Sequence, residues 1–248
     1  MSTTKARASS SRTEMKQRTC VVLAGGLGMR LREFTGGLVP KVLAPVNGEP
    51  FLAHKLRSLE AMGVTRAVLL IGELGEQVEE FVRRHMTTLK VDCVADGPCL
   101  LGTGGSIARA LSKLPERFWV TYGDSLMWTD LEVAERRREE LSLDAVVTVY
   151  HNQNQLQPSN MLVEDELLVR YSKTARDERF QWIDLGLLNF AAAAFTPFSN
   201  GNSVDLVDVL APLVAKRRVL AWSESGRFFD IGTPESLLAT QEWLRQRG

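Results

Sequence analysis

A glycine-rich segment follows the first apolar run of the chain, and Leu23 to Leu31 reads LAGGLGMRL. Glycines after a buried strand let backbone N–H groups approach a phosphate without obstruction by a Cβ atom, and Arg30 adds a mobile cation. Two familiar phosphate loops do not fit: a dinucleotide-binding fingerprint needs glycine where Leu31 stands, and a P-loop needs Gly-Lys followed by Ser or Thr. Taken alone, the segment is equally compatible with an ordinary tight turn.

A second basic residue, Lys41, lies between Pro40 and Pro45 in the sequence PKVLAP. The prolines restrict the backbone, so the ammonium group can be aimed at a fixed point. In isolation Lys41 could be a solvated loop lysine. The two segments together point to chemistry on a small anion, and they need a scaffold that brings them to one place.

Apolar runs and helical spacings alternate through the first half of the chain. We expect strands at residues 19–24, 67–71, 90–95 and 118–122, and helices at residues 51–62, 74–82 and 106–114. A charged helix near residues 131–140 is most simply a solvated face. Strands that alternate with helices predict a parallel sheet with crossover helices on both faces.

The pattern changes after Asp144. We expect antiparallel strands at residues 145–150, 160–164, 167–171 and 181–190, a helix at 204–215, and short strands at 218–222 and 227–231. Thr233-Pro234 supplies an N-cap and a first-turn proline for a closing helix. One domain at residues 19–248 is therefore predicted on one continuous mixed sheet, with a nucleotide-binding half at about 19–140 and a substrate-binding half at about 141–248.

The charge balance argues against a nucleic-acid partner. The chain of 248 residues has 30 Lys and Arg against 30 Asp and Glu, without the basic excess that phosphate-backbone binding usually needs. Residues 1–18 contain five basic residues and one acidic residue, and we expect them to be a disordered basic tail. No apolar run approaches the roughly 18 residues of a membrane helix, so no membrane contact is expected.

Cysteine usage indicates a reducing compartment. Cys20, Cys93 and Cys99 are odd in number and form no CxxC pair, so a disulfide framework and structural zinc are both disfavoured. We expect a cytoplasmic protein.

The two basic segments belong to a longer pattern. GGLGMRLR followed by PKVLAPVNGEPF resembles the signature of the sugar-1-phosphate nucleotidyltransferases. Further segments resemble motifs of that family in the family's order: Leu101-Gly102-Thr103-Gly104-Gly105, Tyr122-Gly123-Asp124-Ser125, the surroundings of Lys173, and Phe229-Asp230-Ile231-Gly232-Thr233-Pro234. The resemblance covers residues 19 to about 246. It implies an α/β, three-layer Rossmann-like nucleotidyltransferase fold with a mixed, mostly parallel central sheet.

The resemblance also implies a reaction. In this family a sugar 1-phosphate attacks the α-phosphorus of a nucleoside triphosphate and pyrophosphate leaves in line, so positioning and charge neutralisation provide most of the catalysis. Arg30 would stabilise the leaving pyrophosphate, Lys41 and Lys173 would contact the phosphates of the two substrates, and Asp124 would complete the catalytic set. Asp124 and Asp230 would hold Mg²⁺, the expected cofactor.

Binding residues follow from the same resemblance. Nucleotide contacts are expected from Leu23, Ala24, Gly25, Gly26, Gly28, Met29, Arg30, Asp96, Gly102 and Thr103. Sugar-phosphate contacts are expected from Gly104, Asp124, Lys173, Asp184 and Asp230. Two departures stand out: Ser172 precedes Lys173 where many members have an acidic residue, and Asp184 lies where many have an Asn-Gly-Gly or Thr-Gly segment. Asp184 could bind sugar hydroxyls or be a turn or surface aspartate.

Within the family the motifs most resemble the heptose 1-phosphate guanylyltransferase and muramate 1-phosphate uridylyltransferase branches. We therefore expect GTP and a heptose 1-phosphate, with uridylyl, thymidylyl, adenylyl or cytidylyl transfer to another sugar 1-phosphate as alternatives. A glycosyltransferase is disfavoured because Asp124-Ser125-Leu126 lacks the second acid of an Asp-x-Asp motif. A silent regulatory subunit is disfavoured because Arg30, Lys41 and both aspartates are present. A role in nucleotide-sugar biosynthesis is expected, and a homodimer is left open.

Overall fold

A parallel four-stranded unit forms the first part of the sheet. The computed structural model describes residues 16–26, 37–97, 101–226 and 228–246. The strands of this unit lie in the order β5-β4-β1-β6, and all three pairs are parallel. Its strands and the helices between them are β1 (Thr19–Leu23), α2 (Phe51–Ala61), β4 (Arg66–Ile71), α3 (Gly75–Arg84), β5 (Lys90–Ala95), α4 (Gly102–Ala110), the 3-10 turn η2 (Leu111–Lys113) and β6 (Arg117–Tyr122).

The same sheet continues into the second half without interruption and reaches nine strands, in the order β5-β4-β1-β6-β11-β8-β12-β10-β9. β11 pairs antiparallel with both β6 and β8, so it joins the two halves. The elements of this half are α5 (Leu131–Glu140), β8 (Ala145–His151), β9 (Met161–Glu164), β10 (Leu167–Tyr171), β11 (Trp182–Ala191), the 3-10 helix η3 (Ala192–Phe198), α6 (Leu206–Ala215) and β12 (Val219–Ser223). The expected single sheet of mixed direction is confirmed.

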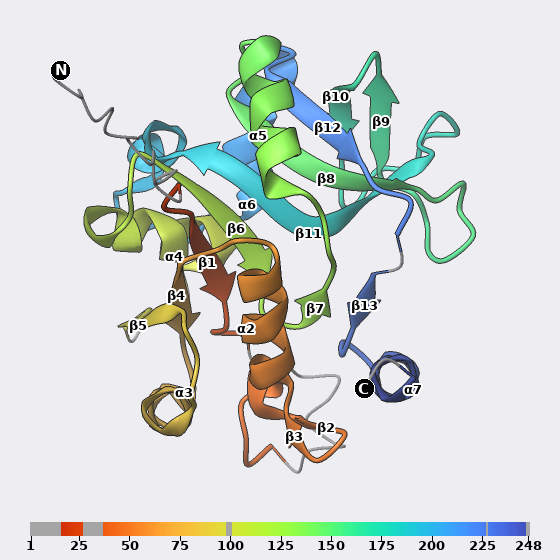
Figure 1. Cartoon of the computed structure of the whole chain (residues 1–248). Helices are drawn as coiled ribbons and strands as arrows, with labels where there is room; N and C mark the ends of the chain where they lie inside the picture. The colour runs from red at the N-terminus through yellow and green to blue at the C-terminus, as the bar shows by residue number, and fades with distance from the viewer. Residues whose placement is uncertain (1–15, 27–36, 98–100, 227, 247–248) are drawn as a thin grey trace, which may run out of the picture.

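Helices cover both faces of the sheet, which makes three layers (Figure 1). One buried cluster joins the sheet to α2, α3 and α5 through residues such as Leu56, Val78 and Leu131. The other joins it to α4, α6 and η3 through Ile107, Val209 and Phe195. The large apolar residues of α2, Phe51, Leu52, Leu56 and Leu59, recur at helical spacing and are buried, so burial of one face is the main reason that the segment is helical.

A small third cluster lies at the carboxyl edge of the parallel strands, where short elements come together. These are the 3-10 turn η1 (Lys41–Leu43), β2 (Pro45–Val46), β3 (Glu49–Pro50), β7 (Ser125–Leu126), β13 (Phe229–Asp230) and α7 (Pro234–Arg245). Val46, Phe51, Leu126, Ile231 and Leu237 form its buried centre. Through this cluster, β13 and α7 pack against β7, the strand that follows β6.

Two expectations about boundaries need correction. The helix expected from Ser106 begins at Gly102, because the glycine-rich segment before Ser106 forms its first turn. Residues 16–18, which the sequence assigns to the tail, contact the body: the backbone oxygen of Arg18 accepts hydrogen bonds from the amides of Thr65 and Arg66 at 2.9 and 3.1 Å. The expected boundary at residue 18 is therefore too far along the chain, and residues 1–15 lie outside the described part.

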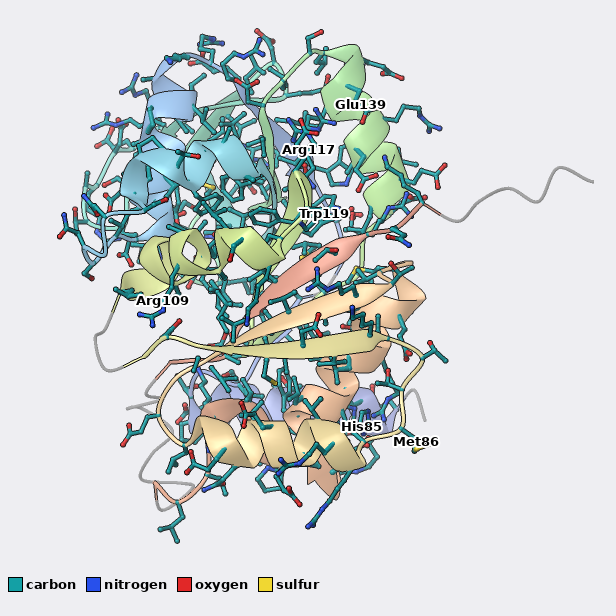
Figure 2. The ribbon with its side chains drawn as sticks, turned by 90° about the vertical axis from the view of Figure 1, so that its left-hand side faces the viewer. His85, Met86, Arg109, Arg117, Trp119 and Glu139 are labelled. Atoms are coloured by element: carbon teal, nitrogen blue, oxygen red, sulfur yellow. The ribbon has the colours of Figure 1, made fainter. Side chains whose placement is uncertain are left out.

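Packing between α5 and the sheet includes a buried polar contact. The indole Nε1 of Trp119 donates to Glu135 at 2.9 Å, and Figure 2 shows Trp119 where β6 passes α5. No helix in the described residues is long and apolar enough to span a membrane.

Candidate active site

The carboxyl ends of β1 and β5 border a cavity of about 300 Å³ beside the first turn of α4. Its lining is Leu23, Gly25, Gly26, Leu70, Asp96, Leu101, Gly102, Thr103, Ser106 and Ser203. Most of the described residues predicted to bind nucleotide therefore meet in one cavity. Ala24 does not, because its side chain is buried and its amide donates to the backbone oxygen of Leu70 at 2.9 Å. Gly28, Met29 and Arg30 lie outside the described residues.

Glycine is required at two positions of this wall. A Cβ atom at Gly25 would come 2.9 Å from the carboxylate of Asp96 and 3.2 Å from the backbone of Gly72. At Gly102, φ is +69° and a Cβ atom would come 2.6 Å from the backbone oxygen of Val204. The glycines thus let backbone approach backbone around the cavity.

Asp96 is the acidic group of this cavity. Burial raises the pKa of Asp96, and a hydrogen bond from Ser106 and the charge of Arg109 act in the opposite direction. Figure 2 shows Arg109 on α4, and its guanidinium lies against Gly97, where a Cβ atom would come 2.9 Å from Nη2. A carboxyl group there can accept hydrogen bonds from a ligand such as a nucleobase or ribose.

Three residues from distant parts of the sequence form a charged centre next to this cavity. Lys41 Nζ lies 2.5 Å from Asp124 Oδ2. β7 pairs antiparallel with β13, and this register sets Ser125 opposite Asp230. The amide of Ile231 donates to the backbone oxygen of Asp124 at 2.9 Å. The structure therefore brings together Lys41, Asp124 and Asp230, as the sequence predicts.

Asp230 is held by the start of the closing helix. Its Oδ1 atom accepts hydrogen bonds from the amide of Gly232 at 2.6 Å and from Ser236 Oγ at 2.7 Å. Among the described residues, no protein group donates to Asp230 Oδ2 or to Asp124 Oδ1. Nor do three or more His, Cys, Asp or Glu side chains gather anywhere in that part of the chain as a metal cage would need. Two carboxylates on adjacent strands can hold Mg²⁺ when phosphate oxygens and water complete its coordination.

Lys173 lies on the other side of the cavity, at the junction of the two halves. Its Nζ atom is 3.0 Å from Asp205 Oδ2, and Thr103 Oγ1 donates to Asp205 Oδ1 at 3.4 Å. Lys173 is half-exposed, so an incoming phosphate can compete with Asp205 for its ammonium group.

Asp184 is partly buried on β11 and accepts a hydrogen bond from the amide of Gly186 at 2.7 Å. Burial raises the pKa of Asp184 to about 6, although this hydrogen bond and the charge of Lys173 lower it. Asp184 is thus neither an exposed surface residue nor paired in a salt bridge among the described residues.

Gly104 lies where α4 packs against the segment that leads into α6. It is buried, its amide donates to the backbone oxygen of Val204 at 2.8 Å, and a Cβ atom there would come 3.0 Å from Asp205 O and from Val209. The glycine therefore serves the packing of α4 against α6, and its predicted contact with the sugar phosphate stays a prediction.

A second cavity, of about 570 Å³, opens beside Asp230. Tyr150, Leu156, Phe228 and Phe229 give it apolar walls, and Ser225, Gly226, Ser236, Ala239 and Thr240 complete the lining. The rings of Tyr150 and Phe228 lie with their centres 6.2 Å apart. Asp230 therefore belongs to the charged centre and also lines a space large enough for a small ligand.

The family follows from a comparison with known proteins. The sequence profile of the MobA-like NTP transferase domain matches residues 20–221. The chain belongs to this family. This confirms the family resemblance drawn from the sequence and the enzyme class that it implies, a nucleotidyltransferase.

Individual relatives of this NTP transferase agree with the assignment. The D-glycero-alpha-D-manno-heptose 1-phosphate guanylyltransferase of Campylobacter jejuni is 23% identical over 216 residues, which cover 87% of this chain and 95% of that protein. Two solved structures share the fold. HddC from Yersinia pseudotuberculosis complexed with GMP-PN has a TM-score of 0.72 at 22% identity and covers 92% of this chain and 100% of its own. The inositol-1-phosphate CTP transferase from T. maritima has a TM-score of 0.77 at 23% identity, with coverages of 93% and 96%.

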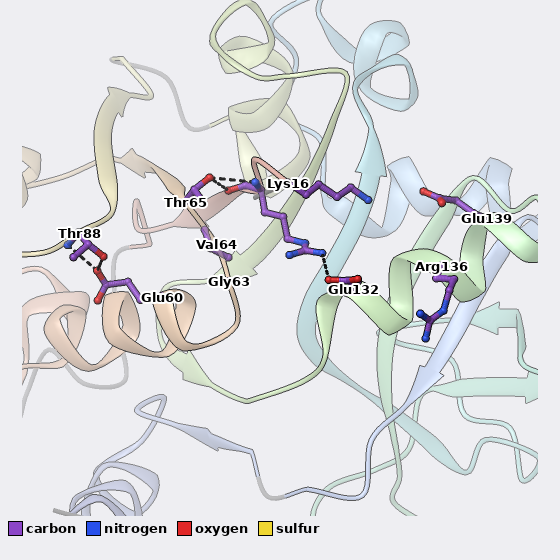
Figure 3. A pocket seen from close by; sticks show the side chains of 10 residues that line it. Lys16, Glu60, Gly63, Val64, Thr65, Thr88, Glu132, Arg136 and Glu139 are labelled. Carbon is purple, nitrogen blue, oxygen red and sulfur yellow. Dashed lines mark hydrogen bonds and ion pairs between the residues drawn. The ribbon is translucent and has the colours of Figure 1, made fainter. Parts of the chain in front are cut away.

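A larger cavity of this NTP transferase, about 800 Å³, lies at the opposite ends of the parallel strands. Lys16, Thr65, Glu132 and Arg136 are among its lining residues (Figure 3). It is at the amino ends of β1 and β4, whereas Asp124 follows the carboxyl end of β6. Ligands of parallel α/β sheets bind at the carboxyl ends of the strands, so the smaller cavities mark the candidate site.

Sequence reasoning missed Asp205 and Ser236, the partners of Lys173 and Asp230. Both lie at helix N-termini: Asp205 is the N-cap of α6, and Ser236 forms a capping box with Thr233 on α7. Capping patterns in the sequence could have located these residues, but not the charged side chains that they contact.

Proposed function

We propose that this NTP transferase joins a nucleoside triphosphate to a sugar 1-phosphate and releases pyrophosphate. The observation that supports this most directly is the Lys41–Asp124 pair at 2.5 Å beside Asp230. Asp230 lines the second cavity, and Gly123, next to Asp124, donates its amide to Leu23, which lines the glycine-lined cavity. Cations and carboxylates of this kind suit a reaction that brings two phosphate groups together.

GTP with a heptose 1-phosphate is the preferred substrate pair. The C. jejuni relative is named for this activity, and a structural neighbour was solved with GMP-PN. Another nucleobase or sugar 1-phosphate remains the alternative, and the T. maritima neighbour named for CTP and inositol 1-phosphate illustrates that range. The base would lie in the glycine-lined cavity against Asp96, and the sugar would extend toward Asp184 and Asp230.

In the proposed reaction an oxygen of the sugar phosphate forms a bond to the α-phosphorus, and the bond from that phosphorus to the pyrophosphate oxygen breaks. The attacking phosphate is already ionised, so no general base is needed. Lys41 would neutralise phosphate charge at the reacting centre, and Lys173 would exchange Asp205 for the sugar phosphate. Arg30 would stabilise the pyrophosphate.

Asp124 and Asp230 are the residues that would hold Mg²⁺. When bound, the ion would supply positive charge to the phosphate oxygens as the bond to pyrophosphate breaks. Ser236 and Gly232 fix one oxygen of Asp230, which leaves the other free to face the ion. Lys41 similarly contacts one oxygen of Asp124.

The experiment is a panel of nucleoside triphosphates against a set of sugar 1-phosphates, read by pyrophosphate release with and without Mg²⁺. Asp124→Ala and Asp230→Ala should each abolish turnover while the protein stays folded. Asp165→Asn, in the exposed turn between β9 and β10, is the matched carboxylate control and should keep wild-type turnover. Wild-type rates in either alanine variant would refute the metal assignment, and no release with any pair would refute the proposed reaction.

A further inference from the structure

A buried lysine lies beneath the charged centre. Lys55 projects from α2 and is 1% exposed. Its Nζ atom donates to Thr121 Oγ1 and to the backbone oxygen of Ser125, both at 2.7 Å. These two acceptors lie on either side of the Gly123-Asp124 step. The ammonium group therefore bridges the end of β6 and the start of β7.

This lysine has no carboxylate in contact among the described residues. Burial lowers the pKa of Lys55 to about 8, and the nearby groups that oppose the shift are Cys20 and Asp124. Cys20 is not a counter-ion at neutral pH, because burial raises the pKa of its thiol to about 12. Asp124 is therefore the nearby negative charge that favours the protonated form of Lys55. A buried cation with only neutral oxygens in contact is expensive to retain, so its position beneath a candidate active site calls for a functional explanation.

The backbone around Asp124 has little freedom of its own. The amide of Gly123 donates to the backbone oxygen of Leu23 at 3.0 Å, and a Cβ atom at Gly123 would come 2.7 Å from that oxygen. The backbone oxygen of Asp124 is fixed by Ile231. Lys55 fixes the next carbonyl, that of Ser125. Three consecutive residues are thus each held by a different element: β1, the end of β13 and α2.

We propose that Lys55 is a positioning residue of the transferase, whose buried ammonium group holds the turn that presents the Asp124 carboxylate and places positive charge behind it. The inference rests on the proposed function, because Asp124 is assigned there to the reacting centre. Lys55 touches no substrate in this assignment. It acts through Asp124, which also contacts Lys41 at the open side of the site.

The kinetic test compares Lys55→Met with a matched buried cation. Arg138 is 6% exposed on α5 and donates to the backbone oxygen of Leu143 at 3.1 Å, so Arg138→Met also removes a buried charge and leaves a carbonyl without its donor. Lys55→Met should lower kcat about 10- to 100-fold with little change in KM for the triphosphate, since misplacement of a reacting group affects the chemical step. Arg138→Met should lower stability and leave kcat unchanged. Equal kcat for Lys55→Met and wild type, or equal losses in both variants, would overturn the proposal.

A second readout needs no substrate, so failure of the proposed function and failure of this inference remain distinguishable. The urea midpoints of wild type, Lys55→Met, Asp124→Asn and the double variant form a thermodynamic cycle. Lys55→Met should lower the urea midpoint clearly when Asp124 is present. It should lower the midpoint less in the Asp124→Asn background, because the buried ammonium group has already lost its counter-charge there. The corresponding cycle of Arg138→Met with Asp124→Asn should be additive.

Additive midpoints in the Lys55 cycle would contradict the coupling even if the enzyme proved fully active. If Lys55→Met does not fold, Thr121→Val replaces it in both tests, because it removes one acceptor of the ammonium group and keeps the side-chain volume. Thr121→Val should also lower kcat, but by a smaller factor than is expected for Lys55→Met. Wild-type kcat together with additive midpoints for Thr121→Val would then overturn the proposal.

Discussion

The ionisation of Asp184 links the stability of the folded protein to the proposed role of this residue in binding the sugar. Burial raises its pKa from the ordinary value of 3.8 to about 6. The folded state therefore disfavours the ionised form, and the resulting loss of stability is complete above about pH 6 and absent below about pH 4. An acid retained in this condition at neutral pH is more easily explained by a ligand than by the fold.

Asp184→Asn should stabilise the protein at neutral pH. An asparagine Oδ1 can still accept the hydrogen bond from Gly186, and the neutral amide avoids burial of a charge. Because Asp184 is partly exposed, we expect a gain of about 1 kcal/mol at pH 7.5, or about 2–4 °C in Tm. The measurement is the melting temperature of both proteins between about pH 4 and 8.

The gain should shrink as the pH falls through 6 and disappear near pH 4. If Asp184 also binds sugar hydroxyls, the stabilised variant should show a raised KM for the sugar 1-phosphate. A variant that is less stable than wild type at neutral pH would show that the ionised carboxylate is stabilised by its surroundings, contrary to the burial argument.

The motifs quoted from the sequence include Lys41, Asp124 and Asp230, which the structure brings together. Asp124 and Asp230 lie at the ends of expected strands, and Lys41 lies between two prolines. The same reasoning could not find Lys55 or predict the role of Gly104. Lys55 belongs to an ordinary helical pattern of apolar residues, and its contacts with Thr121 and Ser125 span more than sixty positions of sequence. Contacts between residues so far apart in sequence depend on how α2 packs on β6, and no local sequence pattern encodes that packing.

At the scale of elements, the N-terminus of α7 positions Asp230 through Ser236. Ser236→Ala should lower kcat about tenfold, because a residue that orients a metal-binding carboxylate usually has an effect of this size. It should also lower stability by about 1 kcal/mol through loss of the capping box. The measurements are pyrophosphate release and urea unfolding.

Thr233→Ala is the matched control for this prediction. Thr233 Oγ1 accepts from the amide of Ser236 at 3.2 Å, so its loss weakens the same cap and leaves the bond from Ser236 to Asp230. The two variants should lose similar stability, but only Ser236→Ala should lose activity. Equal activity in both would mean that the cap, and not the orientation of Asp230, is the role of Ser236.

The first turn of α4 shows why a helix start was misplaced by the sequence. Three glycines in Gly102–Gly105 predict a loop, because glycine is unfavourable in helices. The helix nevertheless begins there, since the amides of Gly104 and Gly105 donate to the backbone oxygen of Val204 at 2.8 and 3.1 Å. Tertiary contact with the segment before α6 outweighs local propensity, and glycine is what allows that contact.

Gly102→Ala should therefore disturb both the element and the cavity that it lines. The positive φ and the 2.6 Å approach to Val204 predict a loss of about 2–3 kcal/mol and a raised KM for the triphosphate. Gly226→Ala is the control for stability, because a Cβ atom there meets nothing within 4 Å. A Gly102→Ala protein with an unchanged urea midpoint would show that the backbone relaxes without cost.

At the scale of the whole molecule, the alternation of strands and helices predicted one continuous sheet, and the structure has it. The position of β11 between β6 and β8 could not be predicted, because antiparallel pairing of distant apolar runs depends on which edges are free. β11 is also irregular between Asp184 and Leu188. Gly186 has a φ of +80°, and a Cβ atom there would come 2.7 Å from Tyr122, so the irregular segment is set by contact with β6 across the two halves.

The amino-terminal segment provides a test of where the folded body begins. Glu135 is 7% exposed and contacts Lys16 at 2.7 Å and Arg18 at 3.4 Å. Burial alone raises the pKa of Glu135, but hydrogen bonds from Lys16 and Trp119 and the charges of Arg18 and Lys16 lower it overall. These contacts therefore contribute stability above the ordinary pKa of the carboxyl group, and the contribution is lost as the pH falls through the lowered value.

Removal of residues 1–15 should leave the urea midpoint unchanged, because Lys16 and Arg18 remain. Removal of residues 1–18 should lower the unfolding free energy at neutral pH by about 3 kcal/mol, since it leaves a buried carboxylate without its cations. Glu135→Gln should recover part of this loss in the shorter chain and destabilise the full-length chain, where the carboxylate still has its partners. Equal midpoints for the two truncated chains would mean that the body begins after residue 18, as the composition of the segment alone suggests.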